Sequence, residues 1–311
     1  MHKPVAVILL NWNTPEYTAN CILSLQKFCD DTLFDVIVAD NGSTDNSLSL
    51  LKAQFSDLIY IDNKENLGFA EGNNRALEYS ISNGYTYSLV MNNDTEVDED
   101  LVAGLLQHME NHPEAGAVQP AIYWMHNKTE IWNGEGKFNK LIGKTISDLS
   151  IPDEAALKTF KTAEWATGCC MMLRNSALQK SGLFNKLFFL YFEDVDLSFR
   201  LRDAGYDVHY LPAIKMYHEA GVSAKVSAPK KEGNLSPVIH YYVSRNHIWI
   251  LRRYGNPLFY PVNLVYNGLY YLALLGYFIL RQRNQKAGLL IKGLKEGIFT
   301  PKKVIWPSQY K

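Results

Sequence analysis

Cysteine is scarce in this chain of 311 residues, which has four cysteines and no CxxC pair: Cys21, Cys29, Cys169 and Cys170. So few thiols argue against a disulfide scaffold or a zinc site and favour a reducing, cytosolic compartment. The apolar run within MHKPVAVILLNWN is too short for a secretory signal, and no small-residue cleavage site follows it. We therefore expect residues 5–12 to form a first β-strand.

Three glycine-rich nucleotide-binding motifs are also missing. No GxGxxG follows the first apolar run, which excludes the common dinucleotide fingerprint, and no GxxxxGK[ST] is present, which excludes a P-loop. The N-terminal glycine-rich loop of sugar nucleotidyltransferases is absent as well. If a nucleotide binds here, its phosphates need another counter-charge. A divalent cation held by carboxylate is the obvious candidate, because Mg²⁺ and Mn²⁺ favour oxygen ligands and bridge diphosphates.

Acidic and basic residues are present in nearly equal numbers but are unevenly distributed. Residues 225–311 contain 14 lysines and arginines and two acids, Glu232 and Glu296, so this tail has a net charge near +12. Residues 1–224 contain 17 basic and 30 acidic residues and have a net charge near −13. This split suggests a polyanionic partner for the tail, either a nucleic acid or an anionic membrane surface.

Apolar runs alternate with amphipathic segments over the first 113 residues, which predicts an α/β fold with a mainly parallel sheet covered by helices. Ser43 or Thr44 is the expected cap of the second helix. The expected strands are 5–12, 34–40, 58–63, 86–93, 115–124, 165–173 and 206–211, and the expected helices are 13–28, 43–55, 70–84, 98–113 and 193–205.

The composition of the chain changes near residue 225, and residues 227–237 resemble a linker. We therefore expect one domain over 1–225 and a helical region over 226–311. Residues 258–280 carry no charge and are long enough to span a bilayer, yet they include Pro261 and many tyrosines. A buried helical hairpin, an in-plane membrane helix and a true span all remain open. The basic flanks favour contact with anionic lipid.

Polar clusters follow the first, second and fourth expected strands: NWNTPE, ADNGSTD and NNDTE. Ligands of open α/β sheets bind at the carboxyl ends of the strands, so these clusters are candidates for one site. Asp40, at the end of the second strand, is placed to accept a hydrogen bond from a base or a ribose hydroxyl. The alternative is that Asp40 only caps the turn DNGS.

Seven segments occur in order along the chain: VILLNWNTPEYTANCILSL, VIVADNGSTDNS, NKENLGFAEGNNRAL, LVMNNDTEVDEDLV, WATGCCMMLRNSAL, FLYFEDVDLSFRLRDAGY and MYHEAGVS. Together they resemble glycosyltransferase family 2, which has the GT-A fold, and most closely its bacterial rhamnosyltransferase-like members. The likeness covers roughly residues 3–225 and extends more weakly to YYVSRNHIWILRRY.

The resemblance implies a nucleotide and metal site. Asn92-Asn93-Asp94 matches the DxD motif of the family but has Asn92 in place of the first acid, which leaves Asp94 as the metal ligand. A late histidine of the family matches His218, so we expect these two residues to hold Mn²⁺ or Mg²⁺. Without the resemblance, a surface or core histidine is the simpler interpretation of His218. The implied nucleotide-binding residues are Asn11, Asn13, Asp40, Gly68, Asn74 and Asn93.

The segment FEDVDLSFR matches the ED motif of the family, so Asp194 is the expected general base and Glu193 the expected supporting residue. Neighbours on a helix point about 100° apart, which argues against a close carboxylate dyad. The simpler interpretation is a first helical turn enriched in acids by the helix dipole. Asp196 and Arg200 have the spacing of an ordinary helix ion pair. Trp165 is placed either to stack on an acceptor sugar or to pack in the core.

The resemblance therefore implies a metal-dependent inverting glycosyltransferase, which we expect to move rhamnose from dTDP-rhamnose to a polysaccharide or lipid-linked glycan. The basic, tyrosine-rich tail places it in the cytoplasm, peripheral on the inner face of the membrane, with no nucleic-acid partner. One alternative keeps this chemistry with UDP-GlcNAc, UDP-galactose or UDP-galactofuranose as donor. The other is a catalytically weak nucleotide-sugar-binding subunit of a membrane assembly complex, motivated by the missing first acid. The ED pair and His218 argue against that second alternative.

Overall fold

The computed structural model describes residues 3–221, 232 and 235–307, which fall into two compact units. The helical unit includes two short segments that come from inside the expected catalytic domain. The expected boundary at residue 225 and most of the expected linker lie outside the described residues, so both stay predictions. The sheet unit consists of Met1–Gly136, Ser147–Phe189 and Glu193–Ala220, and the helical unit of Lys137–Ile146, Leu190–Phe192 and Gly221–Lys311.

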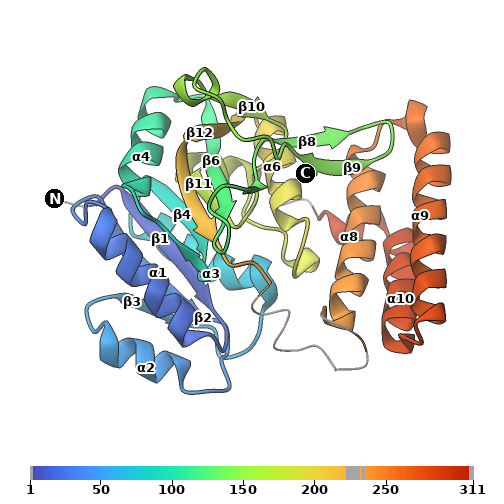
Figure 1. The fold of residues 1–311 in the computed structure, drawn as a ribbon, viewed down its shortest axis with the longest axis horizontal. Coiled ribbons are helices and arrows are strands. Elements are labelled where there is room, and N and C mark those ends of the chain that lie inside the picture. The colour runs from blue at the N-terminus through green and yellow to red at the C-terminus, as the bar shows by residue number, and fades with distance from the viewer. Residues whose placement is uncertain (1–2, 222–231, 233–234, 308–311) are drawn as a thin grey trace. The chain divides into compact units, whose positions relative to one another are not determined.

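The first half of the sheet unit alternates strand and helix, as the apolar pattern predicts (Figure 1). Its strands run parallel in the order β3-β2-β1-β4. This order places Asn11 beside Asp40 at the carboxyl ends of β1 and β2. The strands are rich in buried Val, Ile, Leu and Ala, as parallel strands usually are. The elements are β1 (Val5–Asn11), α1 (Pro15–Phe28), β2 (Phe34–Asp40), α2 (Ser47–Gln54), β3 (Ile59–Asp62), α3 (Gly68–Ser82) and β4 (Tyr87–Asn92).

The second half of the sheet unit adds strands of both directions. β11 (Cys170–Arg174) lies antiparallel between β4 and β6 (Ala115–Trp124), and β12 (Asp207–His218) runs parallel to β6. The expected α/β class, with a largely parallel central sheet and a helical C-terminal region, is confirmed. The remaining elements are β5 (Thr95–Glu96), α4 (Leu101–Asn111), β7 (Ile131–Asn133), β8 (Gly136–Asn139), β9 (Lys144–Ser147), β10 (Lys161–Ala163), α5 (Asn175–Ser181) and α6 (Glu193–Asp203), with short 3₁₀ turns at Ala156–Lys158 and Lys186–Phe188.

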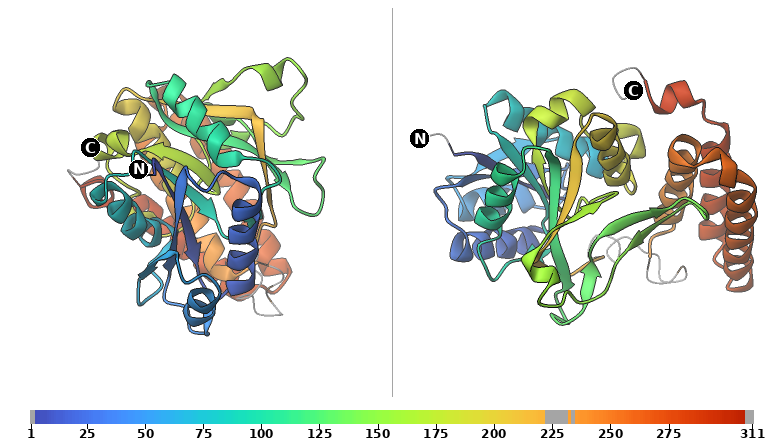
Figure 2. Two further views of the ribbon diagram at one scale, coloured as in Figure 1. Left: turned by 90° about the vertical axis from the view of Figure 1, so that its left-hand side faces the viewer. Right: turned by 90° about the horizontal axis from the view of Figure 1, so that it is seen from above.

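Helices cover both faces of the sheet, as Figure 2 shows. Successive strand residues point to opposite faces, so Val7 and Leu9 join one core whereas Ala6 and Ile8 join the other. The first core is closed by α1, α2 and α4, and the second by α3, α5 and α6. This enclosure leaves the strand ends, with the polar clusters that follow them, as the place for a ligand.

The helical unit is built around α8, α9 and α10, with a small core that includes Tyr271, Phe278 and Leu290. α8 and α10 approach closely because Gly293 and Gly297 face α8; a Cβ at Gly293 would lie 2.2 Å from Ser244 Oγ. The helices are α8 (Pro237–Tyr254), α9 (Tyr260–Leu280), α10 (Asn284–Phe299) and α11 (Lys302–Ile305), with a 3₁₀ turn at Pro257–Phe259.

Candidate active site

The ends of β1 and β2 are joined by the side chains of Asn11, Asp40 and Ser43. Asp40 Oδ1 accepts hydrogen bonds from Asn11 Nδ2 at 2.8 Å and from Ser43 Oγ at 2.7 Å, and its Oδ2 accepts from the Ser43 amide at 2.9 Å. Asp40 therefore does close the DNGS turn, as the simpler interpretation held. Its carboxylate also lies at the carboxyl ends of the strands, where contact with a nucleotide is expected.

This network continues to the end of β4. Thr18 Oγ1 donates to Asn11 Oδ1 at 2.8 Å, and Asn93 Nδ2 donates to Thr18 Oγ1 at 2.8 Å. Asn13, whose φ is 55°, joins through its amide, which donates to Ser43 Oγ at 3.0 Å. Four of the six predicted nucleotide-binding residues thus belong to one connected set of hydrogen bonds.

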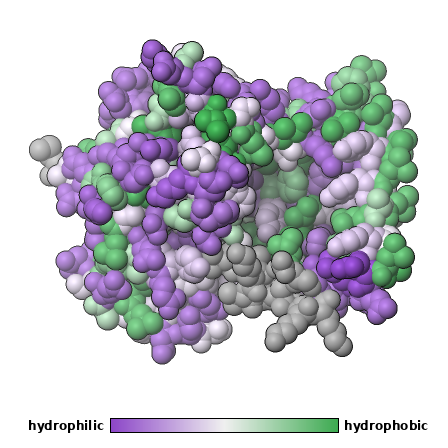
Figure 3. All heavy atoms as spheres, viewed as in Figure 1, coloured by the Kyte–Doolittle hydropathy of each residue, from purple (hydrophilic) through white to green (hydrophobic). Residues whose placement is uncertain are grey.

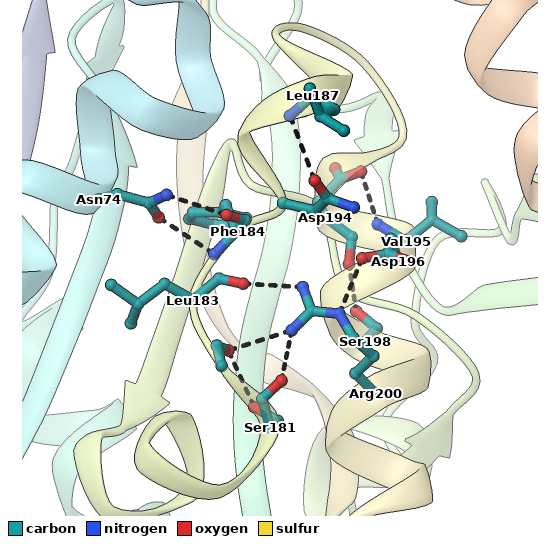
Figure 4. A network of polar contacts seen from close by, with 12 residues as sticks. Asn74, Ser181, Leu183, Phe184, Leu187, Asp194, Val195, Asp196, Ser198 and Arg200 are labelled. Atoms are coloured by element: carbon teal, nitrogen blue, oxygen red, sulfur yellow. Dashed lines mark hydrogen bonds and ion pairs between the residues drawn. The ribbon is translucent and has the colours of Figure 1, made fainter. Parts of the chain in front are cut away.

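Gly68 and Asn74, the other two, lie in α3. Gly68 has a φ of 75°, and a Cβ there would lie 2.5 Å from the Phe189 carbonyl oxygen, so only glycine fits. Asn74 is buried, with its Oδ1 accepting from the Phe184 amide at 3.1 Å and its Nδ2 donating to the Phe184 carbonyl at 2.9 Å (Figure 4). Asn74 thus fixes the chain at Phe184, and Gly68 permits the close approach of Phe189. Contact of Gly68 and Asn74 with a nucleotide stays a prediction.

Asp94 and His218 are brought together by an antiparallel pairing that follows the fourth strand. The chain turns after Asn92 into β5, in which Thr95 lies opposite His218 at the end of β12. Asp94 Oδ1 then lies 3.0 Å from His218 Nε2, and both side chains are buried. The imidazole is packed edge to face against Trp132, with ring centroids 4.3 Å apart.

The Asp94 and His218 pair fits a divalent cation. The 3.0 Å contact between Asp94 Oδ1 and His218 Nε2 is a hydrogen bond, and it holds one carboxylate oxygen and one imidazole nitrogen close enough for both to reach the same ion. A mixed pair of one carboxylate oxygen and one imidazole nitrogen suits Mn²⁺ at least as well as Mg²⁺. The side chain of Asn92 stands where the family has its first acid, and its Nδ2 lies 3.4 Å from His218 Nε2. Asn92 adds no charge, so the site depends on Asp94.

Asp194 lies in the first turn of α6, and two backbone amides position its carboxylate. Its Oδ2 accepts from the Gly168 amide at 3.0 Å and its Oδ1 from the Val195 amide at 2.8 Å. The next residue, Cys169, accepts a hydrogen bond from the Asn92 amide at 2.8 Å. The dipeptide Gly168–Cys169 therefore connects the expected base directly to the segment that carries the expected metal ligand.

The two adjacent acids differ in their surroundings. Burial, together with the charge of Asp194, raises the pKa of Glu193 well above its usual range, and Glu193 Oε2 has no hydrogen-bond partner among the described residues. Burial also raises the pKa of Asp194, but the amides of Gly168 and Val195 counteract this effect. A pair of acids whose environments differ in this way divides naturally into an ionised member and a neutral one. Asp194 is the member suited to act as base.

Asp196 and Arg200 form the predicted ion pair, with Arg200 Nε 2.8 Å from Asp196 Oδ2 and both side chains buried. The guanidinium also donates to the carbonyls of Ser181 and Leu183, at 2.6 Å and 2.8 Å (Figure 4). Arg200 thereby fixes the loop after α5 to α6. The pair is structural, as the sequence predicts, although it lies deeper than an ordinary surface pair.

Trp165 exposes 8% of its surface, and its backbone forms a bridge with Gly136. A Cβ on Gly136 would lie 2.8 Å from the Trp165 ring, so glycine permits this close packing. The ring is therefore mainly a packing element of the sheet unit. Stacking of Trp165 on an acceptor sugar stays a prediction.

A second group of ligand-type side chains lies where β6 and β12 begin, at the amino ends of these parallel strands. Ligand atoms of His112, Glu114 and His209 all lie within 4.8 Å of one another. His112 Nδ1 is already 2.9 Å from Glu114 Oε1, and His209 Nδ1 is 2.9 Å from His108 Nε2. Burial lowers the pKa of His108 to about 4, so that ring is neutral. Within this group His112 is thus bonded to Glu114, whereas the hydrogen bond of His209 is made to His108, on α4.

Ser43, Thr18 and Gly168 shape the site but are not among the predicted site residues. The sequence predicts Ser43 or Thr44 as the cap of the second helix, but α2 begins at Ser47 with Asn46 as its cap, and Ser43 hydrogen-bonds to Asp40 instead. An Asx turn in DNGS was the available signal. For Thr18, the available signal was a polar residue on the buried side of α1. Gly168 had none, because its role depends on which chain segment its amide meets.

A family model described as "Glycosyl transferase family 2" matches residues 6–182, more than half of the chain. N-acetylglucosaminyl-diphospho-decaprenol L-rhamnosyltransferase from Mycobacterium tuberculosis is 26% identical over 203 residues, 59% of this chain and 66% of that protein. Rhamnosyltransferase WbbL from Escherichia coli is 26% identical over 227 residues, 70% of this chain and 83% of that protein. The match thus spans slightly less than two thirds of the first relative's length.

Among solved structures, GalNAc-T7 with UDP, GalNAc and Mn²⁺ aligns with a TM-score of 0.65 over 83% of this chain and 50% of that chain. The two sequences are 13% identical, so this likeness concerns the fold alone. It agrees with the GT-A fold that the resemblance implies.

Proposed function

The chain belongs to glycosyl transferase family 2, and from this premise we propose that it is a metal-dependent, inverting transferase of a sugar from a nucleoside diphosphate to a hydroxyl group. The observation that carries the proposal is the Gly168–Cys169 link. The Gly168 amide donates to the Asp194 carboxylate, and the Cys169 carbonyl accepts from the backbone amide of Asn92, in the segment that carries Asp94. A single displacement requires the general base and the diphosphate site to be held in a fixed relative geometry.

In the proposed reaction an acceptor hydroxyl attacks the anomeric carbon of the donor. The new bond joins the acceptor oxygen to that carbon, the bond to the diphosphate oxygen breaks, and the proton passes to Asp194. A single displacement of this kind inverts the anomeric configuration. Asp194 is suited to the role because burial raises its pKa while two amides keep it able to ionise.

Asp94 and His218 would hold the metal, and a bound Mn²⁺ or Mg²⁺ would neutralise the diphosphate. Asp40 and Asn11 orient the nucleotide from the adjoining strand ends, within a network that leaves their side chains little freedom. Because these positions are set before the donor binds, little reorganisation accompanies the reaction.

The relatives support a more specific donor and acceptor. Both name rhamnose as the transferred sugar, and the Mycobacterium protein is named for an N-acetylglucosaminyl-diphospho-decaprenol acceptor. We therefore assign dTDP-rhamnose as donor and a lipid-linked or polysaccharide glycan as acceptor. The experiment is a donor panel that contains dTDP-rhamnose and UDP-sugars, with nucleoside diphosphate release measured with and without Mn²⁺. Absence of turnover by any donor with any acceptor would remove the proposed function.

The helical unit supports attachment to a membrane. Pro257–Leu280 is long and apolar enough to cross a bilayer, and only 22% of its most apolar window is buried. Figure 3 shows apolar residues along α9, at the right of the view. On this exposed face Leu264, Leu269 and Leu272 are 77%, 64% and 65% exposed. An apolar face of this size in water usually marks a membrane or a partner.

Contacts on the other face of α9 favour an in-plane position over a span. Asn263 and Asn267 donate to backbone carbonyls of the β8–β9 turn, and Lys144 lies 4.0 Å from the ring centroid of Tyr270. A spanning α9 would carry this lysine and its hairpin into the hydrocarbon, which is costly. An in-plane α9 buries its apolar face and keeps the hairpin in water. We place the protein in the cytoplasm, on the inner face of the membrane.

A further inference from the structure

The four residues before the ED pair have an unusual backbone. Phe189, Tyr191 and Phe192 have φ values of 63°, 69° and 69°, and Phe189 combines its φ with a ψ of −58°. Bulky side chains rarely adopt such angles, because the left-handed region brings the Cβ close to the backbone. Strain of this kind persists only where surrounding contacts hold the chain, and it concentrates at functional sites.

The first residue of the segment is held by α3. The Phe189 carbonyl accepts from the amides of Phe69 at 2.7 Å and Ala70 at 3.2 Å, so it caps the N-terminus of that helix. Gly68 admits this approach because it has no Cβ. The carbonyl is thus fixed in the sheet unit, at the point where the chain leaves that unit.

The middle of the segment is held by α8. Asn246 Nδ2 donates to the carbonyls of Leu190 at 2.9 Å and Tyr191 at 2.7 Å. Asn246 is fully buried, and the ring of His247 stacks on Phe192 with centroids 5.8 Å apart. All of these contacts lie within the helical unit, and the chain returns from them directly to Glu193.

The orientation of the Asn246 amide is itself determined by a neighbour. Arg245 Nε donates to Asn246 Oδ1 at 2.9 Å, so the amide nitrogen is the atom that faces the two carbonyls. The Arg245 guanidinium lies 4.3 to 5.0 Å from the ring centroids of Tyr241, Tyr242 and Trp249. Arg245 therefore fixes the orientation of the Asn246 side-chain amide.

From these contacts, and resting on the proposed function, we propose that Asn246 is a positioning residue that aims Asp194 at the acceptor hydroxyl. Two hydrogen bonds from one buried amide hold the strained backbone immediately before the base. Without them Tyr191 and Phe192 relax toward ordinary angles, and the start of α6 moves with them. The helical unit thus has a role in the reaction besides its proposed contact with lipid.

The test compares Asn246→Ala with Asn263→Ala in the full-length chain. Asn263 is a matched control, because its Nδ2 also donates to two successive carbonyls, those of Lys140 and Leu141, in a loop that does not lead to the base. Release of dTDP from dTDP-rhamnose is measured with Mn²⁺ and octyl N-acetylglucosaminide. We expect Asn246→Ala to lower kcat at least about tenfold, since small misplacements of catalytic groups have effects of this size. The KM for the donor and the dTDP affinity should stay within about twofold.

Hydrogen exchange supplies a readout that does not depend on turnover. We expect amides within 190–195 to exchange faster in Asn246→Ala than in the wild type and to be unchanged in Asn263→Ala. Arg245→Lys, which loses the Nε donor, should shift exchange and kcat in the same direction by a smaller factor. Equal losses of kcat in the Asn246 and Asn263 variants, or unchanged exchange in 190–195, would overturn the inference. A wild type that turns over no donor would overturn the proposed function instead, and the exchange result would still decide whether Asn246 holds the segment.

Discussion

Asp94 and His218 meet at 3.0 Å, Oδ1 to Nε2, although 124 positions separate them in the chain. The contact exists because the two-residue strand β5 pairs with the last two residues of β12. Asn92 replaces the first acid of the motif, so the end of β4 carries one carboxylate fewer than the pattern of the family. The pair is thus the centre on which the proposed metal dependence rests.

The first prediction concerns this pair. We expect Asp94→Asn and His218→Gln each to weaken Mn²⁺ binding at least about tenfold, because each removes one of two ligands. Electron paramagnetic resonance of free Mn²⁺ in the presence of dTDP measures the affinity. His112→Ala, in the histidine cluster where β6 and β12 begin, is the matched control and should leave the affinity unchanged. If His112→Ala weakens binding while Asp94→Asn does not, the metal site has been assigned to the wrong end of the sheet.

The second prediction concerns the pH dependence of the reaction. The base must be ionised, and burial raises the pKa of Asp194 above its usual value of 3.8. The rate should therefore rise with pH with unit slope and level off above the range of an ordinary aspartate. The measurement is kcat/KM for dTDP-rhamnose from pH 4 to 8. Asp194→Asn should lower kcat by roughly three orders of magnitude or more, and a variant that retains wild-type kcat would exclude Asp194 as the base.

The third prediction concerns stability and Glu193. Its pKa is higher in the folded chain than in the unfolded chain, so its contribution to stability is fully present below the unfolded value. That contribution is lost as the pH rises through the folded value. Glu193→Gln cannot ionise, so its melting temperature relative to the wild type should increase from pH 5 to pH 9. Asp203→Asn, at the exposed end of the same helix, should show a difference that does not change with pH. A pH-independent difference for Glu193→Gln would contradict the prediction.

The fourth prediction concerns the apolar face of α9. The double variant Leu269→Glu, Leu272→Glu should lower sedimentation with vesicles that contain phosphatidylglycerol by at least about fivefold, because two charges would have to enter the apolar layer. Leu149→Glu is the matched control, since Leu149 is 57% exposed in the sheet unit. Weaker binding of the wild type to phosphatidylcholine vesicles would reflect the basic residues that flank α9. Equal sedimentation of the wild type and the double variant would remove the membrane proposal.

Much of the fold could be predicted from local patterns. Alternating apolar runs identify the parallel strands, and the acids before α4 mark its start, where Asp100 Oδ1 accepts from the Ala103 amide at 2.9 Å. The motifs also identified Asp40, Asp94 and Asp194 as candidates. The predicted strands and helices match the structure because strand period and helix capping are encoded within a few residues. The functional roles of these three acids stay predictions.

What the sequence alone determined about this protein is the family, the α/β class and the kinds of side chain available for its chemistry. Only the tertiary structure decided which of them meet: Asp94 with His218 through β5, Asp194 with the Gly168 amide, and Asn246 with the carbonyls before the ED pair. The reason is physical. Each of these contacts joins segments far apart in the chain, and the pairing depends on how whole strands and helices pack rather than on any local pattern.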